Sequence, residues 1–388
     1  MPLANALLTK EQLNQPEETY PLELVFCPSC TLVQITETVP PEKLFREYPY
    51  FSSFSDTMLN HSQELARRMI SERRLNGHSL VLEVASNDGY LLQYYKERSI
   101  PVLGIEPAAN VARVAQKERG IPTITEFFNA ALARQIRDGG QRADVIHAHN
   151  VLGHVANLNE FVQGIQLLLK DEGVAIIEVP YVQEMIDRVE FDTIYHEHLC
   201  YFSLKALDNL FRRHALMVQD VELIPIHGGS VRLSLAKTSG AHRISSRVSD
   251  LLIQESNRGM DRLDFYRGFH RKVNELKGSL RRLLLELKGG GKCLAAYGAA
   301  AKGTTLLNYF GLGQDILDFV VDRSTHKQGR YMPGVHLLIY SPGELLNTMP
   351  DYVLLLTWNF TEEILAQQTE YRRLGGHFII PVPQVAIV

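Results

Sequence analysis

SLVLEVASNDGYLLQYYKER, residues 79–98, reads as a β-rich run, a polar turn and a helical run in direct succession. The alternation continues downstream, where the strand-like runs IPVLGIEP, ADVIHAHNVLGHV and GVAIIEVP are separated by helical segments. Strands that alternate with helices at this spacing build a parallel sheet with helices on both faces. The sequence therefore predicts an α/β fold whose main part is a doubly wound, mostly parallel sheet.

A second, smaller α/β unit is predicted near the C-terminal end. The strand-like runs CLAAYG, ILDFVVDR, DYVLLLTWN and HFIIPVP follow one another there and indicate a Rossmann-like domain. The residues before it are rich in Arg, Leu, Lys and Glu, which favours a helical connector. We therefore predict four parts: an N-terminal lobe at 1–75, a cofactor-binding domain at 76–240, the connector at 241–289 and the C-terminal domain at 290–388.

Composition narrows the class of protein. A hydrophobic content of 45% with 22% charged residues is normal for a globular protein, and 388 residues are too many for one core. A net charge of -4 gives no electrostatic reason to bind nucleic acid or an anionic membrane. No apolar run is long enough to span a bilayer, and the start MPLANALLTKEQ lacks the features of a signal peptide. We expect a cytoplasmic protein.

The turn after the first strand is the predicted cofactor site. The strand ends at Glu83, and the turn contains Ser86, Asn87, Asp88 and Gly89. It lacks the GxGxxG pattern that admits a pyrophosphate, so a ligand without phosphate groups at this point is favoured. Glu106 ends the next strand, where a carboxylate suits the two hydroxyls of a ribose, and Asn150 follows the third strand. The competing interpretation is a ligand-free domain with polar turns.

The most unusual stretch is DTIYHEHLCYFS, residues 192–203. It places Tyr195, His196, Glu197, His198 and Tyr201 within seven positions. Apolar side chains would fill a core at lower desolvation cost, so the cluster favours proton transfer beside the bound cofactor. Zinc binding is the alternative, but the helical HExxH pattern is absent and adjacent His-Glu-His ligands converge poorly on one ion.

Taken together, these motifs resemble those of the nucleotide-sugar C-methyltransferases. The resemblance runs through CPSCTLVQ, EYPYFSSFS, VLEVASNDGYLL, GIEPAANVA, DTIYHEHLCYFS, HGGSVRLSLA, YGAAAKGTTLLNY and GGHFIIPVP. It implies a class I fold that binds S-adenosylmethionine, with Ala85 in the turn and Pro107 beside Glu106 as further cofactor contacts. It also implies an N-terminal zinc-binding lobe, and a C-terminal domain that helps to hold a nucleotide-linked (thymidine-diphosphate) 4-ketosugar.

The zinc lobe departs from that family. Cys27 and Cys30 form one CxxC pair in FCPSC, whereas a tetrahedral zinc site needs four ligands. Members of the family usually carry another CxxC pair before the PLAN segment, and this sequence begins at MPLAN. Zinc is therefore a doubtful cofactor of this chain, and the pair reads as a half-site or as two structural thiols.

The chemistry implied by the resemblance is methylation of C3 next to a 4-keto group. Removal of the C3 proton gives an enolate, which requires a base near neutral pKa and a donor to the enolate oxygen. His198 is our choice for the base, with Glu197 orienting it or binding the sugar and Tyr195 and Tyr50 stabilising the enolate. His196 alternates with His198 and is assigned a structural role.

Sugar-nucleotide contacts are expected from two further stretches. YGAAAKGTTLLNY opens a helix whose backbone N–H groups and one lysine suit a diphosphate, although close strand–helix packing explains the small residues equally. TWNF lies at a strand end, and HGGS precedes another strand. The candidates are His227, Gly228, Ser230, Tyr297, Lys302, Gly303, Asn308, Trp358 and Asn359.

Three alternative functions stay open. Transfer of the methyl group to oxygen or nitrogen needs no acidified C–H bond. An NAD-dependent sugar dehydrogenase or epimerase would need GxGxxG and Tyr-x-x-x-Lys patterns that the sequence does not show. A non-catalytic nucleotide-sugar binding protein would not need the cluster at residues 195–198. The sugar configuration, the pathway and the oligomeric state are not fixed by the sequence.

Overall fold

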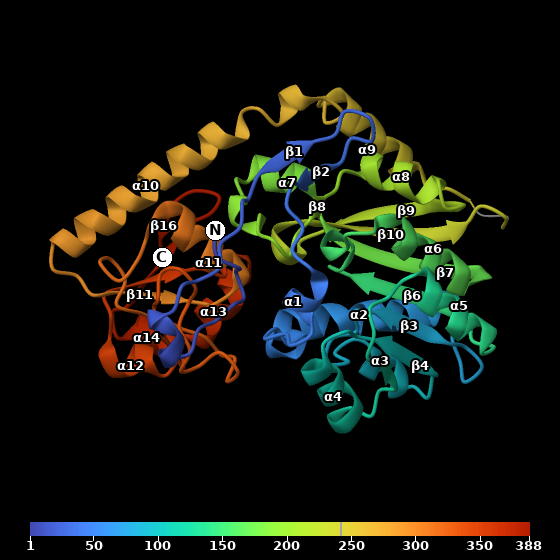
Figure 1. Cartoon of the computed structure of the whole chain (residues 1–388), viewed down its shortest axis with the longest axis horizontal. Coiled ribbons are helices and arrows are strands. Elements are labelled where there is room, and N and C mark those ends of the chain that lie inside the picture. The colour runs from blue at the N-terminus through green and yellow to red at the C-terminus, as the bar shows by residue number, and fades with distance from the viewer. Residues whose placement is uncertain (241–242) are drawn as a thin grey trace.

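The computed structural model describes residues 1–240 and 243–388 and contains three sheets. The largest has seven strands in the order β5-β4-β3-β6-β7-β10-β9 (Figure 1). The first five run parallel, and β10 is antiparallel to both of its neighbours. This confirms the predicted mostly parallel sheet. Its strands are β3 (Val81–Val84), β4 (Val102–Ile105), β5 (Thr123–Ile124), β6 (Ala143–His149), β7 (Leu169–Pro180), β9 (Leu216–Ile224) and β10 (Ser230–Lys237).

Helices cover both faces of this sheet because its central strands are apolar on both sides. All four residues of β3 and all four of β4 are buried. Ser55 caps α2, where the Met58 N–H donates to the Ser55 Oγ at 3.3 Å. The helices are α2 (Asp56–Arg73), α3 (Leu92–Lys96), α4 (Ala109–Glu118), α5 (Ala130–Asp138), α6 (Leu158–Leu168), α7 (Val182–Asp187) and α8 (Leu204–Arg212).

A second α/β unit lies nearer the C-terminus, as expected. Its six strands run in the order β13-β12-β11-β14-β15-β16, and only the last pair is antiparallel. The strands are β11 (Leu294–Tyr297), β12 (Phe319–Val321), β13 (Ile339–Tyr340), β14 (Tyr352–Leu355), β15 (His377–Ile380) and β16 (Ala386–Ile387). The helices are α11 (Ala301–Phe310), α12 (Glu344–Thr348), α13 (Thr361–Gln367) and α14 (Thr369–Arg373).

Two helices, α9 (Ser246–Asn257) and α10 (Phe269–Gly289), connect the two units, and α10 runs along the outside from one to the other (Figure 1). The third sheet joins β1 (Leu24–Phe26) and β2 (Val33–Ile35) to β8 (Cys200–Tyr201). The short helix α1 (Pro41–Phe45) follows β2 in the chain. None of the described helices combines the length and the apolar character that crossing a bilayer requires.

The first twenty residues, which we name the N-terminal strap, lie against the C-terminal unit (Figure 1). The Thr304 hydroxyl of α11 donates to the Ala4 carbonyl at 2.9 Å. Leu8 and Tyr331 exchange two backbone hydrogen bonds of 2.9 Å, and Gly334 N–H donates to the Glu17 carboxylate at 2.9 Å. The strap therefore joins the part of the chain that is most distant from it in sequence.

Candidate active site

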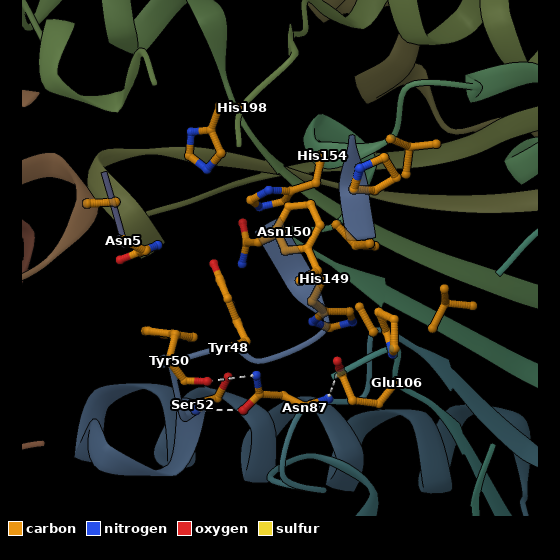
Figure 2. A pocket seen from close by; sticks show the side chains of 18 of the residues that line it. Asn5, Tyr48, Tyr50, Ser52, Asn87, Glu106, His149, Asn150, His154 and His198 are labelled. Atoms are coloured by element: carbon orange, nitrogen blue, oxygen red, sulfur yellow. Dashed lines mark hydrogen bonds between the residues drawn. The ribbon is translucent and has the colours of Figure 1, made fainter. Parts of the chain in front are cut away.

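A cavity of about 470 Å³ lies at the carboxyl ends of the central strands. Its wall combines the turn after β3, the ends of β4 and β6, the segment that precedes α2, and the start of α11. Figure 2 shows Asn87, Glu106 and His149 at one end, and Asn5, Tyr48, His154 and His198 around the other. The two predicted sites, one for a cofactor and one for proton transfer, therefore open into a single space.

The cofactor end is organised around Glu106. Its two carboxylate oxygens accept the N–H groups of Asn87 and Ala108, both at 2.9 Å. Burial raises the pKa of Glu106 to about 7, against the lowering effect of these two bonds. Each oxygen keeps a free lone pair, so the carboxylate fits the two hydroxyls of a ribose. Ala85, Pro107 and Asn150 line the same end, as the sequence predicts.

The remaining turn residues lie beneath the cavity wall. Glu83 is fully buried, and its oxygens have no hydrogen-bond partner among the described residues. Burial, and then the nearby Asp88, raise the pKa of Glu83 well above its usual range. Gly89 has φ +79° with the Ile121 side chain 3.0 Å from where a Cβ would be, so this position requires glycine. Ser86 is buried beside Gly104. These residues shape the turn and do not line the cavity.

An aromatic part of the cofactor end was missed by the sequence reasoning. Phe127, Phe128 and Asn129 follow β5 and line the cavity together with Val151. Apolar rings at this position suit the flat face of a purine. β5 has only two residues and therefore gives no strand pattern to read. The adjacent phenylalanines in TEFFNA were the only signal.

The other end of the cavity, which the sequence predicts for proton transfer and which we call the proton-transfer end, contains a hydrogen-bonded pair, Tyr195 and His198. His198 Nδ1–H donates to the Thr193 carbonyl at 2.8 Å, which leaves Nε2 as the acceptor. The Tyr195 hydroxyl donates to that Nε2 at 2.7 Å. Burial, and then the nearby His154, lower the pKa of His198 well below its usual value. His198 is therefore a neutral imidazole whose unprotonated Nε2 faces the Tyr195 phenol.

His154 lies against the pair, with its ring 4.7 Å from the His198 ring in an edge-on arrangement. Burial lowers the pKa of His154 to about 4, so it adds no positive charge at neutral pH. His196 points the other way and bonds the Pro21 carbonyl at 2.9 Å. That contact is consistent with the structural role proposed for His196.

Glu197 is not among the residues that line the cavity, and it is only 2% exposed. The Asn5 amide donates to both of its oxygens, at 2.7 and 2.9 Å, and the Tyr48 hydroxyl donates to one of them at 2.9 Å. Burial raises the pKa of Glu197 to about 7, although Tyr48 and Asn5 oppose the shift. Tyr50 lines the cavity but does not bond Glu197; its carbonyl accepts a hydrogen bond from the Asn87 amide at 3.2 Å.

The predicted substrate residues divide into two sets. His227, Lys302 and Asn359 line the cavity. Lys302 Nζ lies 4.4 Å from the centre of the Trp358 ring, and the Trp358 N–H donates to Asp192 at 2.7 Å. Trp358 does not line the cavity itself, but its ring stabilises the Lys302 ammonium by a cation–π contact. The structure also brings in Lys327, which the sequence reasoning missed.

The second set does not line the cavity, and its members are held by packing or by hydrogen bonds within the chain. The Gly303 Cα faces the Leu356 side chain, where a Cβ would come within 2.9 Å, so it serves close helix packing. The Asn308 amide bonds the Thr304 and Pro333 carbonyls, and the Ser230 hydroxyl bonds the Ile226 carbonyl. Gly228 packs on Glu190, and Tyr297 is buried on the other side of the second sheet. Small or polar residues near a strand end indicated a ligand here, but packing explains them.

Cys27 and Cys30 lie in the turn between β1 and β2. N–H groups of Cys30 and Ser29 lower the pKa of the Cys27 thiol, which suits a metal-binding thiolate. No other His, Cys, Asp or Glu within the described ranges forms a ligand group with them. Two cysteines supply half of the four ligands of a tetrahedral zinc site.

Comparison with known proteins matches the chain to three domain models. Residues 225–383 match the model of a C-methyltransferase C-terminal domain, and residues 58–220 match a methyltransferase domain. Residues 1–45 match a domain whose description proposes zinc binding. The C-methyltransferase NovU of Streptomyces niveus is 34% identical over 387 residues, which cover 100% of this chain and 92% of that protein. The chain belongs to the C-methyltransferase family.

More distant similarities are confined to part of this C-methyltransferase. A ubiquinone biosynthesis O-methyltransferase of Bartonella quintana is 22% identical over 155 residues, 36% of the chain and 61% of that protein. A magnesium protoporphyrin IX methyltransferase structure from Synechocystis, with bound S-adenosylmethionine, is 13% identical with a TM-score of 0.36 and covers 47% of this chain and 82% of that one. The methyltransferase-domain match over residues 58–220 and the membership of the C-methyltransferase family, rather than this distant likeness, assign the chain the class I fold with S-adenosylmethionine as cofactor.

Replacing Glu106 with Gln is expected to weaken S-adenosylhomocysteine binding by roughly tenfold or more, measured by isothermal titration calorimetry. Both Glu106 oxygens accept backbone N–H groups, so a glutamine NH₂ would face one of these donors. Glu126→Gln, an exposed position near the aromatic part of the cofactor end, is the matched control and should bind normally. Equal affinity for both variants would remove Glu106 from the cofactor site.

Proposed function

We propose that this C-methyltransferase transfers a methyl group to C3 of a nucleotide-linked 4-keto-deoxysugar, with thymidine diphosphate as the nucleotide. The observation that carries the proposal is the 2.7 Å hydrogen bond between Tyr195 and His198 at one end of the cavity. Transfer to carbon needs a base beside the methyl donor that removes a carbon-bound proton. Transfer to a hydroxyl or an amine needs no acidified C–H bond and makes a smaller demand on the base. NovU, a relative that spans the whole chain, is named a C-methyltransferase.

The ketone is needed because a sugar C–H bond is otherwise inert. A carbonyl at C4 acidifies the hydrogens on its neighbouring carbons, and loss of one of them gives an enolate whose carbon is nucleophilic. S-adenosylmethionine, when bound, supplies the electrophilic methyl group. The protein has to remove one proton, stabilise one negative oxygen and align carbon with methyl.

Tyr195 and His198 supply the first two functions. In the proposal, the substrate carbonyl oxygen replaces His198 Nε2 as the acceptor of the Tyr195 hydroxyl, and Nε2 is then free for the carbon-bound proton. Burial, and then Glu197, raise the pKa of Tyr195 well above 10, so it stays a neutral donor. The bond from Nδ1–H to the Thr193 carbonyl holds the imidazole in the tautomer that this step requires.

The nucleotide end is assigned to the C-terminal unit. Lys302 and Lys327 are cations in the cavity wall, and Ala300 and Ala301 at the start of α11 line it beside them. Two ammonium groups and the first N–H groups of a ten-residue helix suit a diphosphate. The sugar would then lie between these residues and the Tyr195–His198 pair.

The test combines product mass with hydrogen exchange. Incubation of the protein with S-adenosylmethionine and a thymidine-diphosphate 4-ketosugar should add one CH₂ to the sugar, and NMR should place the new methyl on C3. In deuterated water without methyl donor, the hydrogen on C3 should exchange, and His198→Ala should stop that exchange. A methyl group on oxygen or nitrogen, with no exchange on carbon, would contradict the proposal. C5 also neighbours the ketone. A methyl group on C5 would therefore contradict the assignment to C3 but not the transfer to carbon.

A further inference from the structure

We propose that Asn5 is the positioning residue through which Glu197 acts, so that the N-terminal strap is a working part of the active site. The Asn5 amide meets the carboxylate on one side and lines the cavity on the other. Glu197 itself does not line the cavity. The inference rests on the proposed carbon methylation only in the experiment that measures kcat/KM. The titration of Glu197 does not depend on it.

The hydrogen bonds determine which way the Asn5 side chain faces. The Asn5 NH₂ group donates to both Glu197 oxygens, at 2.7 and 2.9 Å, so the donor end of the amide faces the two acceptor oxygens of the carboxyl group. The Asn5 carbonyl oxygen therefore lies at the opposite end of the amide. No donor among the described residues bonds this oxygen, and Asn5 is half-buried in the cavity wall. It is placed to accept a hydrogen bond from a hydroxyl group of the substrate.

Charge explains why Glu197 needs this partner. The groups that face it are the Tyr48 and Tyr195 phenols, the Lys327 ammonium and the Asn5 amide. Hydrogen bonds to a carboxylate favour its charged form, and removal of one donor makes ionisation harder. Loss of the Asn5 amide should therefore raise the pKa of Glu197 from about 7.

The strap holds Asn5 by contacts with the C-terminal unit. The Thr304 hydroxyl bonds the carbonyl of Ala4, the residue just before Asn5. Ala4 also packs with Ala301 of α11 and with Tyr195. The position of Asn5 thus depends on the same helix that contributes Lys302 to the cavity.

The first experiment needs no substrate. The Glu197 carboxyl is titrated by ¹³C NMR in protein labelled at the glutamate side-chain carboxyl, and its signal is assigned by its absence in Glu197→Gln. Asn5→Ala should raise this pKa, and Thr304→Val should raise it in the same direction by less. Asn14→Ala, an exposed position in the same strap, and Thr305→Val, whose hydroxyl bonds only its own helix, are the controls and should not change it. An unchanged titration in Asn5→Ala overturns the inference.

The second experiment is a double-mutant cycle on kcat/KM. Asn5→Ala and Glu197→Gln should each lower kcat/KM by roughly 10- to 100-fold. The kcat/KM of the double variant should be no lower than that of the less active single variant. Multiplied losses would show that the two residues act independently and would overturn the inference. If the wild-type protein does not methylate a ketosugar, the proposed function fails, while the titration still decides the role of Asn5.

Discussion

Replacing His198 with Ala should lower kcat by about 10²–10⁴-fold while leaving the affinity for S-adenosylhomocysteine unchanged. The imidazole offers the unprotonated Nε2 at the proton-transfer end of the cavity, and the Glu106 end is separate from it. The loss should appear in single-turnover methyl transfer, and calorimetry with S-adenosylhomocysteine should show intact binding. His198→Ala therefore separates chemistry from cofactor binding.

Tyr195→Phe is the companion variant, because it removes the hydroxyl that the proposed reaction uses as donor to the enolate oxygen and keeps the imidazole. In it we expect turnover to fall while some exchange of the substrate hydrogen with deuterated water remains. His196→Ala, whose ring bonds the Pro21 carbonyl away from the pair, is the neighbouring control for a histidine loss. Full turnover in His198→Ala would show that another group removes the proton.

Replacing Arg232 with Met should destabilise the fold by about 3–5 kcal/mol, because it leaves the Glu178 carboxylate buried without its cation. Glu178 is fully buried in β7, and Arg232 Nε donates to it at 2.6 Å from the neighbouring β10. His149 and His61 also lie against it, at 3.2 and 3.0 Å. Burial alone would raise the pKa of Glu178, but His149 and then His61 hold it well below the usual range.

The destabilisation should lower the melting temperature by roughly 10 °C, measured by circular dichroism. Arg247→Met is the control, since Arg247 pairs with Asp220 at the surface and its side chain is 56% exposed. An exposed pair contributes about 1 kcal/mol or less, so this variant should melt close to the wild type. Equal melting of the two variants would show that the Glu178 cluster adds nothing to stability.

Much of the fold could be predicted because its strands carry strong local patterns. The runs around β3, β4, β6 and β7 are apolar on both faces, and buried parallel strands have that composition. The short strands β5, β13 and β16 could not be predicted, because two residues give no periodicity. The route of the N-terminal strap depends on contacts such as Thr304 with Ala4, which lie 300 positions apart.

The candidate site divides in the same way. Asn87, Glu106 and His198 stand at strand ends or in a dense polar cluster, so residue type and position are enough to indicate them. Asn5 and Tyr48 reach the site from elsewhere in the chain and carry no local signal. Gly303 and Asn308 were also selected by residue type, and in the structure Gly303 packs against Leu356 while the Asn308 amide bonds the Pro333 carbonyl.

The attachment of the strap to α11 has a consequence for engineering. Exchange of C-terminal halves between relatives is a natural way to seek new acceptor sugars. Such a chimera would keep the N-terminal strap of one protein, but the residues that the strap contacts would come from the other. These residues are Thr304, Tyr331 and Gly334. Hybrids that transplant residues 1–20 together with the donor half should therefore recover more turnover than hybrids joined at a single point.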